Sequence, residues 1–217
     1  MHITVRNLLD LQNNIKVYLN KLNINNFPKI IAVSKTFKID KILPLIEHGQ
    51  VDFGENKVQE ALEKWTEIKK TNSKIKLHMI GKLQTNKVKF AVKLFDYIHS
   101  VDSEKLAKKI ADEENKINKK IKIFLQVNIG DENQKSGINK NDLQNLISYC
   151  REIGLDLIGL MCIPPANIDP ELYFEEMKKL NQIHGFTQLS MGMSSDFLLA
   201  AKHQSTYIRI GSSIFGQ

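Results

Sequence analysis

Ile30-Ile31-Ala32-Val33-Ser34-Lys35-Thr36 predicts the fold, because a short apolar, β-branched run is followed by a helical pattern at about 39–48. The same alternation repeats along the whole sequence. We predict strands at about 29–35, 51–54, 76–80, 97–101, 121–129, 155–163, 187–191 and 206–210. We predict helices at about 4–23, 39–48, 56–70, 84–94, 103–117, 139–153, 170–184 and 195–203. This pattern is typical of an α/β fold, a (β/α)8 TIM-type barrel with an additional N-terminal helix, and the alternative is an open doubly wound sheet.

The composition indicates a soluble, cytoplasmic protein with a single domain over residues 1–217. Its 217 residues are 42% hydrophobic, enough for one sizeable core. The net charge of +7 comes mostly from lysines spaced among acidic residues, which favours a solvated surface over a nucleic-acid partner. No apolar signal segment or membrane span is present. Cys150 and Cys162 lack metal-ligand spacing, so we expect reduced thiols and no metal site.

Lys35 is a lone amine near the end of an apolar strand. An amine taken out of water has its charged form disfavoured, so its pKa falls and it becomes a nucleophile toward an aldehyde, with which it forms a Schiff base. The alternative is a lysine that reaches past the strand end into solvent. The strand by itself favours the second interpretation, and the features that favour the first lie at the other end of the sequence.

Two turns rich in small residues follow the predicted seventh and eighth strands. Residues 190–196 read SMGMSSD, where Gly192 allows a close backbone approach and the serines can cap the next helix, and residues 211–213 read GSS. Barrels often hold phosphate after these two strands. Arg209 lies among isoleucines, so it requires either an acidic partner or a ligand at the mouth. Together with Lys35, these features point to pyridoxal 5'-phosphate (PLP).

The sequence resembles the pyridoxal phosphate homeostasis proteins, the YggS/PROSC group, over nearly its whole length. The stretches that carry the resemblance are AVSKT at 32–36, DFGENKVQE at 52–60, HMIGKLQTNK at 78–87, KSG at 135–137, GLMCIP at 159–164, LSMGMSSD at 189–196 and RIGSSIFG at 209–216. Leu77 and Lys82 depart from residues common in the family. The resemblance implies a monomeric barrel related to the N-terminal domain of alanine racemase.

The resemblance also implies roles for individual residues. Lys35 would carry the Schiff base, Asn56 would lie beside the cofactor, and Arg209 would face the pyridine nitrogen. The phosphate would be held by Ser190, Gly211 and Ser212, and Gly192 and Ser194 are further expected cofactor-binding residues. Secondary ligand contacts are expected from other positions, which are His78, Asn86, Lys135 and Met161.

An arginine opposite the ring nitrogen weakens the ring as an electron sink, which argues against transaminase and decarboxylase chemistry. The related racemases use a second acid/base from a further domain, and we expect none here because the sequence ends at Gln217. We therefore predict no catalytic residue and a non-catalytic carrier that holds PLP as a reversible Schiff base and delivers it to apo-enzymes. The alternatives are a small PLP-dependent racemase or lyase, and a barrel enzyme whose lysine reacts with a sugar phosphate.

Overall fold

The computed structural model describes residues 1–132, 136–166 and 168–216, and its centre is a closed barrel of parallel strands in the order of the sequence. The strands are β1 (Lys29–Val33), β2 (Asp52–Glu55), β3 (Lys76–Met79), β4 (Tyr97–Val101), β5 (Lys122–Val127), β6 (Asp156–Cys162), β7 (Gln188–Ser190) and β8 (Tyr207–Ile210). Because β8 pairs with β1, the sheet has no edge. The predicted (β/α)8 barrel is confirmed, and the open sheet is excluded.

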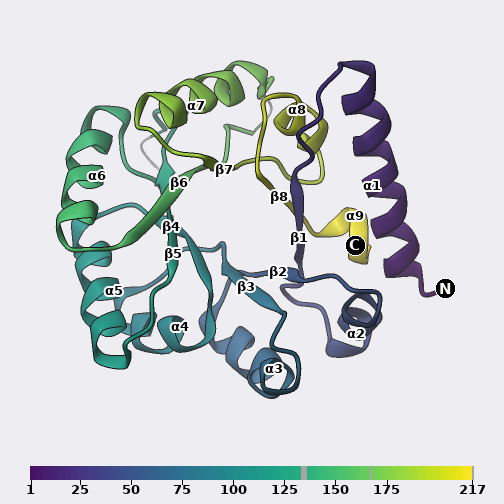
Figure 1. Ribbon diagram of the computed structural model, residues 1–217, viewed down its shortest axis with the longest axis horizontal. Coiled ribbons are helices and arrows are strands. Elements are labelled where there is room, and N and C mark those ends of the chain that lie inside the picture. Colours follow the sequence, from purple (N-terminus) through teal and green to yellow (C-terminus); the bar gives the residue numbers. More distant parts are fainter. Residues whose placement is uncertain (133–135, 167, 217) are drawn as a thin grey trace.

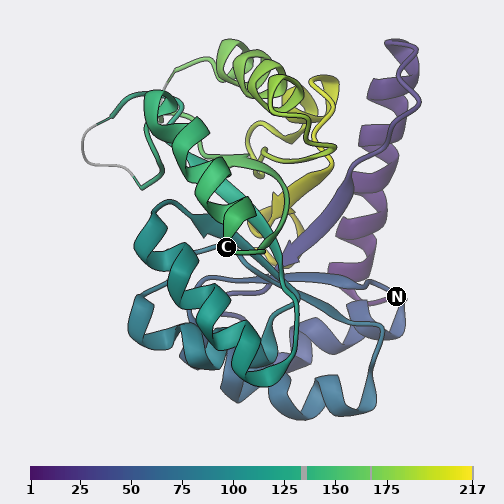
Figure 2. The same ribbon diagram turned by 60° about the vertical axis from the view of Figure 1, so that its left-hand side comes forward.

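Helices surround the barrel on the outside (Figure 1). They are α1 (Ile3–Lys21), α2 (Ile39–Glu47), α3 (Val58–Thr71), α4 (Val88–Leu94), α5 (Glu104–Ile117), α6 (Leu143–Glu152), α7 (Glu171–Ile183), α8 (Phe197–Lys202) and α9 (Ser212–Phe215). Short 3-10 turns, η1 (Thr85–Lys87) and η2 (Lys140–Asp142), lead into α4 and α6. The predicted N-terminal helix, α1, stands outside the barrel beside α9 and β1 (Figures 1 and 2).

The strands are short and apolar because both faces of a barrel strand are buried. Outward-facing residues pack against the helices, and inward-facing residues form a separate cluster in the barrel interior. This interior cluster contains Ile31, Val33, Tyr97, Phe124, Met161 and Tyr207. The barrel is therefore a packed core, and ligands can enter only at its two ends.

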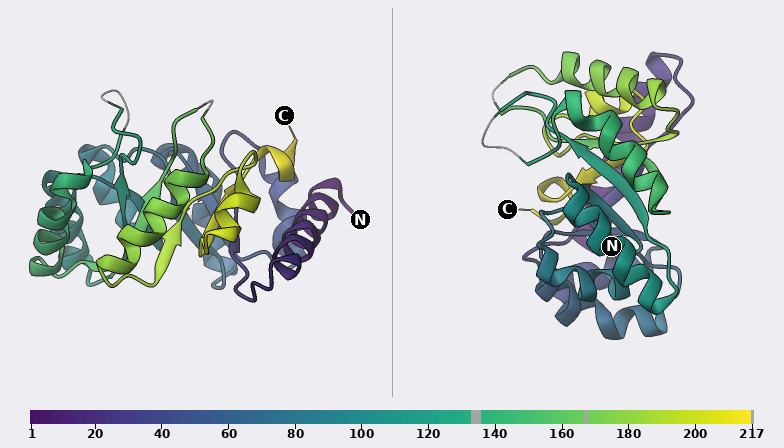
Figure 3. Two further views of the ribbon diagram at one scale, coloured as in Figure 1. Left: turned by 90° about the horizontal axis from the view of Figure 1, so that it is seen from above. Right: turned by 90° about the vertical axis from the view of Figure 1, so that its left-hand side faces the viewer.

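The structure differs from the sequence-based expectation at several places. The first strand ends at Val33 instead of residue 35, and η1 and η2 replace the first turns of two predicted helices. Another difference is α9, which has only four residues and is too short to show a helical period. It follows β8 and lies at the end of the barrel to which the strands point (Figure 3). No helix among the described residues is long and apolar enough to cross a membrane.

Candidate functional site

The predicted site residues gather at the carboxyl ends of four adjacent strands, β7, β8, β1 and β2. In the closed barrel these strands are neighbours, with Ala32 opposite Ile210 and Val33 opposite Gly54. Lys35 and Asn56 follow β1 and β2, and the two small-residue turns follow β7 and β8. Residues distant in the sequence therefore lie around one mouth of the barrel, the end at which barrel proteins bind their ligands.

Lys35 lies in the turn after β1 and its side chain is exposed. The prediction of a desolvated amine within the strand was wrong, and the structure agrees with the alternative of a lysine that reaches past the strand end. The direction of the strand still aims Lys35 at the mouth. Ile31 and Val33 belong to the interior cluster and Ser34 points outward, so the alternation of side chains places Lys35 on the inner side.

The turn that carries Lys35 is tied to α3 by a buried polar cluster. Ser34, Lys64 and Trp65 all donate hydrogen bonds to Oε1 of Glu55, at 2.7, 3.0 and 2.9 Å. Nζ of Lys64 also donates to the carbonyl oxygen of Ser34 at 2.8 Å. Glu55 is fully buried, so this ion pair is held away from solvent. Sequence reasoning missed the cluster because its members are ordinary charged and polar residues of a helix and a strand end.

Thr36, next to Lys35, adopts a left-handed backbone conformation with φ of 65°, which is uncommon for a β-branched residue. Its N–H donates to Oε1 of Glu60 at 2.5 Å, and Glu60 also accepts from Lys64 at 2.9 Å. Burial opposes ionisation of Glu60, but these hydrogen bonds and the charge of Lys64 lower its pKa overall. The strained turn is therefore held by α3 in a defined shape.

The first small-residue turn is joined to β8 through the backbone. Gly192 has φ of 93°, and a Cβ there would lie 2.5 Å from that of Ala200. Its carbonyl oxygen accepts from the N–H of Arg209 at 2.9 Å. The carboxylate of Asp196 accepts from the N–H of Met193 at 2.6 Å, which fixes the first turn. Only glycine fits at position 192, as the sequence indicated.

The second turn begins with Gly211 and continues into α9, where Ser212 is exposed. The first amides of a helix have no acceptor within that helix, so the turn presents N–H donors to the mouth. Gly211 lies beside the end of β1, because a Cβ on it would be 3.5 Å from the carbonyl oxygen of Val33. Ser194, in the first turn, is half-buried. The donors and hydroxyls expected for an anion site are present on both turns.

Arg209 is only 4% exposed, and no carboxylate of the described residues contacts its guanidinium. Nη1 donates to Oγ of Ser190 at 2.8 Å and Nη2 donates to the carbonyl oxygen of Cys162 at 2.9 Å. Desolvation lowers the pKa of Arg209, although the guanidinium stays charged. The structural ion pair considered from the sequence is therefore absent among the described residues, which leaves unused donors on Arg209 for a ligand.

Ser190 does not face the mouth in the same way as the other turn residues. It is fully buried, and Nδ1 of His99 lies 2.9 Å from its Oγ. Nε2 of His99 lies 2.9 Å from Nδ1 of His78, and Nε2 of His78 lies 2.9 Å from Oδ1 of Asp52. We call Asp52, His78, His99, Ser190 and Arg209 the polar chain. Sequence reasoning recognised only three of its members and could not join them, because they come from five strands.

The four predicted secondary contacts do not form one group. His78 and Met161 are fully buried, His78 in the polar chain and Met161 in the interior cluster. Asn86 is exposed in η1, in a groove that it shares with lysines of α5. Lys135 lies outside the described residues. Asn56 is packed against the end of β3, since a Cβ on Gly81 would be 2.4 Å from its carbonyl oxygen.

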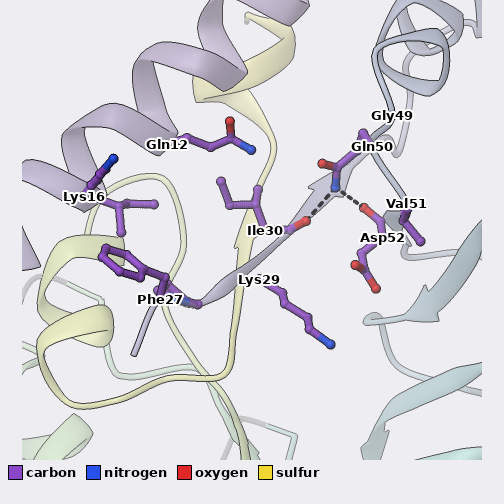
Figure 4. A pocket seen from close by; sticks show the side chains of 11 residues that line it. Gln12, Lys16, Phe27, Lys29, Ile30, Gly49, Gln50, Val51 and Asp52 are labelled. Carbon is purple, nitrogen blue, oxygen red and sulfur yellow. Dashed lines mark hydrogen bonds between the residues drawn. The ribbon is translucent and has the colours of Figure 1, made fainter. Parts of the chain in front are cut away.

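The largest cavity described, of about 580 Å³, lies at the opposite end of the barrel from Lys35. Figure 4 shows that Lys29, Gln50 and Asp52, at the amino ends of β1 and β2, line it. Since ligands of barrel proteins bind at the carboxyl ends of the strands, we place the site at the mouth that carries Lys35 and not at this cavity. No group of side chains able to hold a metal ion occurs among the described residues.

Comparison with known proteins gives a family. Residues 7–217 match the family "Alanine racemase, N-terminal domain". The pyridoxal phosphate homeostasis protein of Pasteurella multocida is 35% identical over 199 residues, covering 87% of this chain and 85% of that protein. The protein of the same name from Haemophilus influenzae is 35% identical over 222 residues, covering 97% and 94%.

Solved structures are similar over the whole chain. PipY of Synechococcus elongatus without PLP has a TM-score of 0.87 at 32% identity and covers 99% of this chain and 100% of that one. The same protein with PLP bound has a TM-score of 0.81 at 32% identity, with coverage of 93% and 100%. An alanine racemase of Clostridium difficile, at 15% identity and a TM-score of 0.71, shares the fold, and this chain covers 57% of it.

Proposed function

The chain belongs to the alanine racemase N-terminal domain family and, within it, to the pyridoxal phosphate homeostasis proteins, and we propose that it binds pyridoxal 5'-phosphate at the mouth of its barrel. The protein keeps the cofactor through a reversible covalent link to Lys35, limits the amount of free aldehyde and passes the cofactor to other enzymes. The observation that carries this proposal is the convergence of an amine, two turns rich in small residues and a buried arginine at the ends of three adjacent strands.

The residues present at the mouth fit the cofactor. Its phosphate requires backbone donors and hydroxyls, which the turns at Gly192–Ser194 and Gly211–Ser212 supply. Bound there, pyridoxal phosphate supplies an aldehyde carbon that reacts with a primary amine. Lys35 supplies that amine on the inner side of the β1 turn, and Asn56 follows the neighbouring strand.

Arg209 determines which chemistry the site can support. Its guanidinium has only donors, so a ring nitrogen that faces it must accept a hydrogen bond and stays unprotonated. An unprotonated ring withdraws electrons weakly, which suits storage of the cofactor better than bond breaking in an amino acid. We therefore propose a non-catalytic carrier, with Ser190 acting mainly as the acceptor that holds Arg209 and not as a phosphate contact.

Peptide mapping tests this function. Purified protein is mixed with pyridoxal phosphate, its absorbance is recorded near about 420 nm, the link is reduced with borohydride and the modified peptide is identified. We expect the label on Lys35 and its loss in Lys35→Ala. Lys38→Ala, three residues further on and also exposed, is the matched control and is expected to label normally. A label on another lysine, or no binding at all, refutes the proposal.

An amino-acid turnover assay separates the carrier from the alternative of a small racemase or lyase. The carrier is expected to release no product amino acid when alanine or another amino acid is added to the loaded protein. Transfer is tested by mixing the loaded protein with an apo-enzyme and following the recovery of that enzyme's activity. We further propose that residues 1–217 act as one cofactor-binding domain and that the protein is a cytoplasmic monomer. Sedimentation of the purified protein measures its oligomeric state.

A further inference from the structure

The polar chain crosses the barrel interior from one end to the other. Asp52 lies at the start of β2, at the amino end, whereas Ser190 and Arg209 belong to the ends of β7 and β8 at the mouth. His78 and His99 join them from β3 and β4, and each of the three junctions on their rings measures 2.9 Å. An unbroken row of hydrogen bonds in an apolar barrel requires a physical reason, because each buried polar group is costly unless paired.

The two ends of the polar chain determine its direction. The guanidinium of Arg209 can only donate, so Ser190 Oγ accepts at one end, and the carboxylate of Asp52 can only accept at the other end. Both rings are neutral, because burial lowers the pKa of His78 and lowers that of His99 well below its ordinary value. A neutral imidazole has one donor and one acceptor nitrogen. Each ring therefore accepts a hydrogen bond from one neighbour and donates a hydrogen bond to the next.

Only one arrangement of protons then satisfies every contact. Arg209 donates to Ser190, the hydroxyl of Ser190 donates to Nδ1 of His99, and Nε2–H of His99 donates to Nδ1 of His78. Nε2–H of His78 then donates to Asp52. In the reversed arrangement a lone pair of His78 would face the carboxylate at 2.9 Å, which is repulsive.

We propose that Asp52, His78 and His99 are positioning residues that hold Ser190 and Arg209 in a single donor-acceptor orientation at the cofactor mouth. The orientation of these side chains follows from the hydrogen bonds of the polar chain alone. Its effect on cofactor binding rests on the proposed function. Ser190 is kept as an acceptor on the side of Arg209, and together with the carbonyl of Cys162 it fixes the plane of the guanidinium. The donors of Arg209 that neither Ser190 nor Cys162 occupies are then held in a fixed orientation.

Asp52 is suited to be the acceptor end of the polar chain because its side chain meets solvent. Its side chain is 15% exposed, whereas that of His78 is fully buried. Asp52 lines the 580 Å³ cavity at the amino end of the barrel, as Figure 4 shows. Water there stabilises the charged carboxylate, so the chain has a hydrated negative end and a dry positive end.

The first experiment determines the tautomers in protein free of cofactor. NMR of ¹⁵N-labelled histidine rings at neutral pH is expected to show His78 and His99 each protonated on Nε2 alone. In Asp52→Asn the amide can donate as well as accept, so we expect both rings to become tautomer mixtures. A ring of His78 or His99 that is protonated on Nδ1 in the unaltered protein overturns the proposal. The measurement needs no bound ligand, so its failure is distinct from a failure of the proposed function.

The second experiment measures the consequence at the mouth by titrating pyridoxal phosphate and recording the spectrum of the bound cofactor. We expect Asp52→Asn to bind the cofactor about three- to tenfold more weakly, the value of one hydrogen bond, with a shifted absorbance. Asp52→Glu, which keeps a carboxylate, is expected to recover part of the affinity. Asp156→Asn, the same change on an exposed residue at the amino end of β6, is the matched control. Equal affinity and equal spectra for Asp52→Asn and Asp156→Asn overturn the proposal. If Asp52→Asn does not fold, the histidine tautomers of the unaltered protein decide whether the proposal holds.

Discussion

Replacing Glu55 by alanine tests whether the buried cluster beside Lys35 holds the turn. The change leaves the indole N–H of Trp65 without an acceptor and leaves the hydroxyl of Ser34 with only the carbonyl oxygen of Gly54 at 3.5 Å, each at about 1–3 kcal/mol for a buried donor that loses its partner. Lys64 keeps two acceptors, the carbonyl of Ser34 and the carboxylate of Glu60, so its charge adds little. Oε2 of Glu55 already lacks a partner among the described residues, and its removal offsets about 1 kcal/mol.

The expected net loss in the free energy of unfolding is about 3 kcal/mol, measured by urea denaturation at neutral pH. Glu55→Gln keeps an acceptor for Ser34 and Trp65, so it is expected to lose only about 1 kcal/mol. Glu63→Ala, on the exposed face of α3, is the control and should stay within about 0.5 kcal/mol. The rate of borohydride-trapped labelling at Lys35 should fall in Glu55→Ala. A loss under about 1 kcal/mol with unchanged labelling would refute the reasoning.

Three further perturbations follow from buried groups. Both histidines of the polar chain have pKa values below the ordinary 6.5 in the folded protein. Below pH 6.5 the unfolded protein therefore binds protons that the folded protein does not. The free energy of unfolding is expected to fall as the pH drops below 6.5. The slope is at most about 1.4 kcal/mol per pH unit and histidine, and equal urea midpoints at about pH 7.5 and 5.5 would contradict it. Gly159→Ala places a Cβ 1.9 Å from the carbonyl oxygen of Gln188, so we expect the free energy of unfolding to fall by at least about 3 kcal/mol. In Gly211→Ala the new Cβ meets nothing closer than 3.5 Å, so this control should leave the urea midpoint unchanged. Burial raises the pKa of Cys150 and of Cys162 to about 12, so neither should react with a thiol reagent in the native protein, and rapid labelling of either would show that the core opens.

The sequence alone favoured the barrel, because its evidence is local, and the pairing of β8 with β1 excluded the open sheet. Each strand is a short apolar run and each helix has its own period, so eight repeats of the pattern predict the closed sheet without knowledge of any contact. The same locality explains the errors at element ends. The turn at Lys35 ends β1 two residues early because Glu55 and Lys64, distant in the sequence, bind Ser34 there.

The sequence also determined which residues surround the mouth. Lys35, Gly192 and Arg209 each stand out by a local rule, which is a lone amine after an apolar run, a glycine among small residues, and an arginine among isoleucines. The place of the turns after the seventh and eighth strands then predicted the end of the barrel at which they meet. Their assignment to individual contacts with pyridoxal phosphate stays a prediction.

Only the tertiary structure decided what these residues bind within the protein. The exposure of Lys35, the absence of a carboxylate beside Arg209 among the described residues, and the row of hydrogen bonds from Ser190 to Asp52 all depend on side chains from different strands. Hydrogen bonds have strict distances and directions, and no periodicity in a sequence records them. Closing the barrel brings five strands to one interior, and that closure turns separate polar residues into a single directed chain.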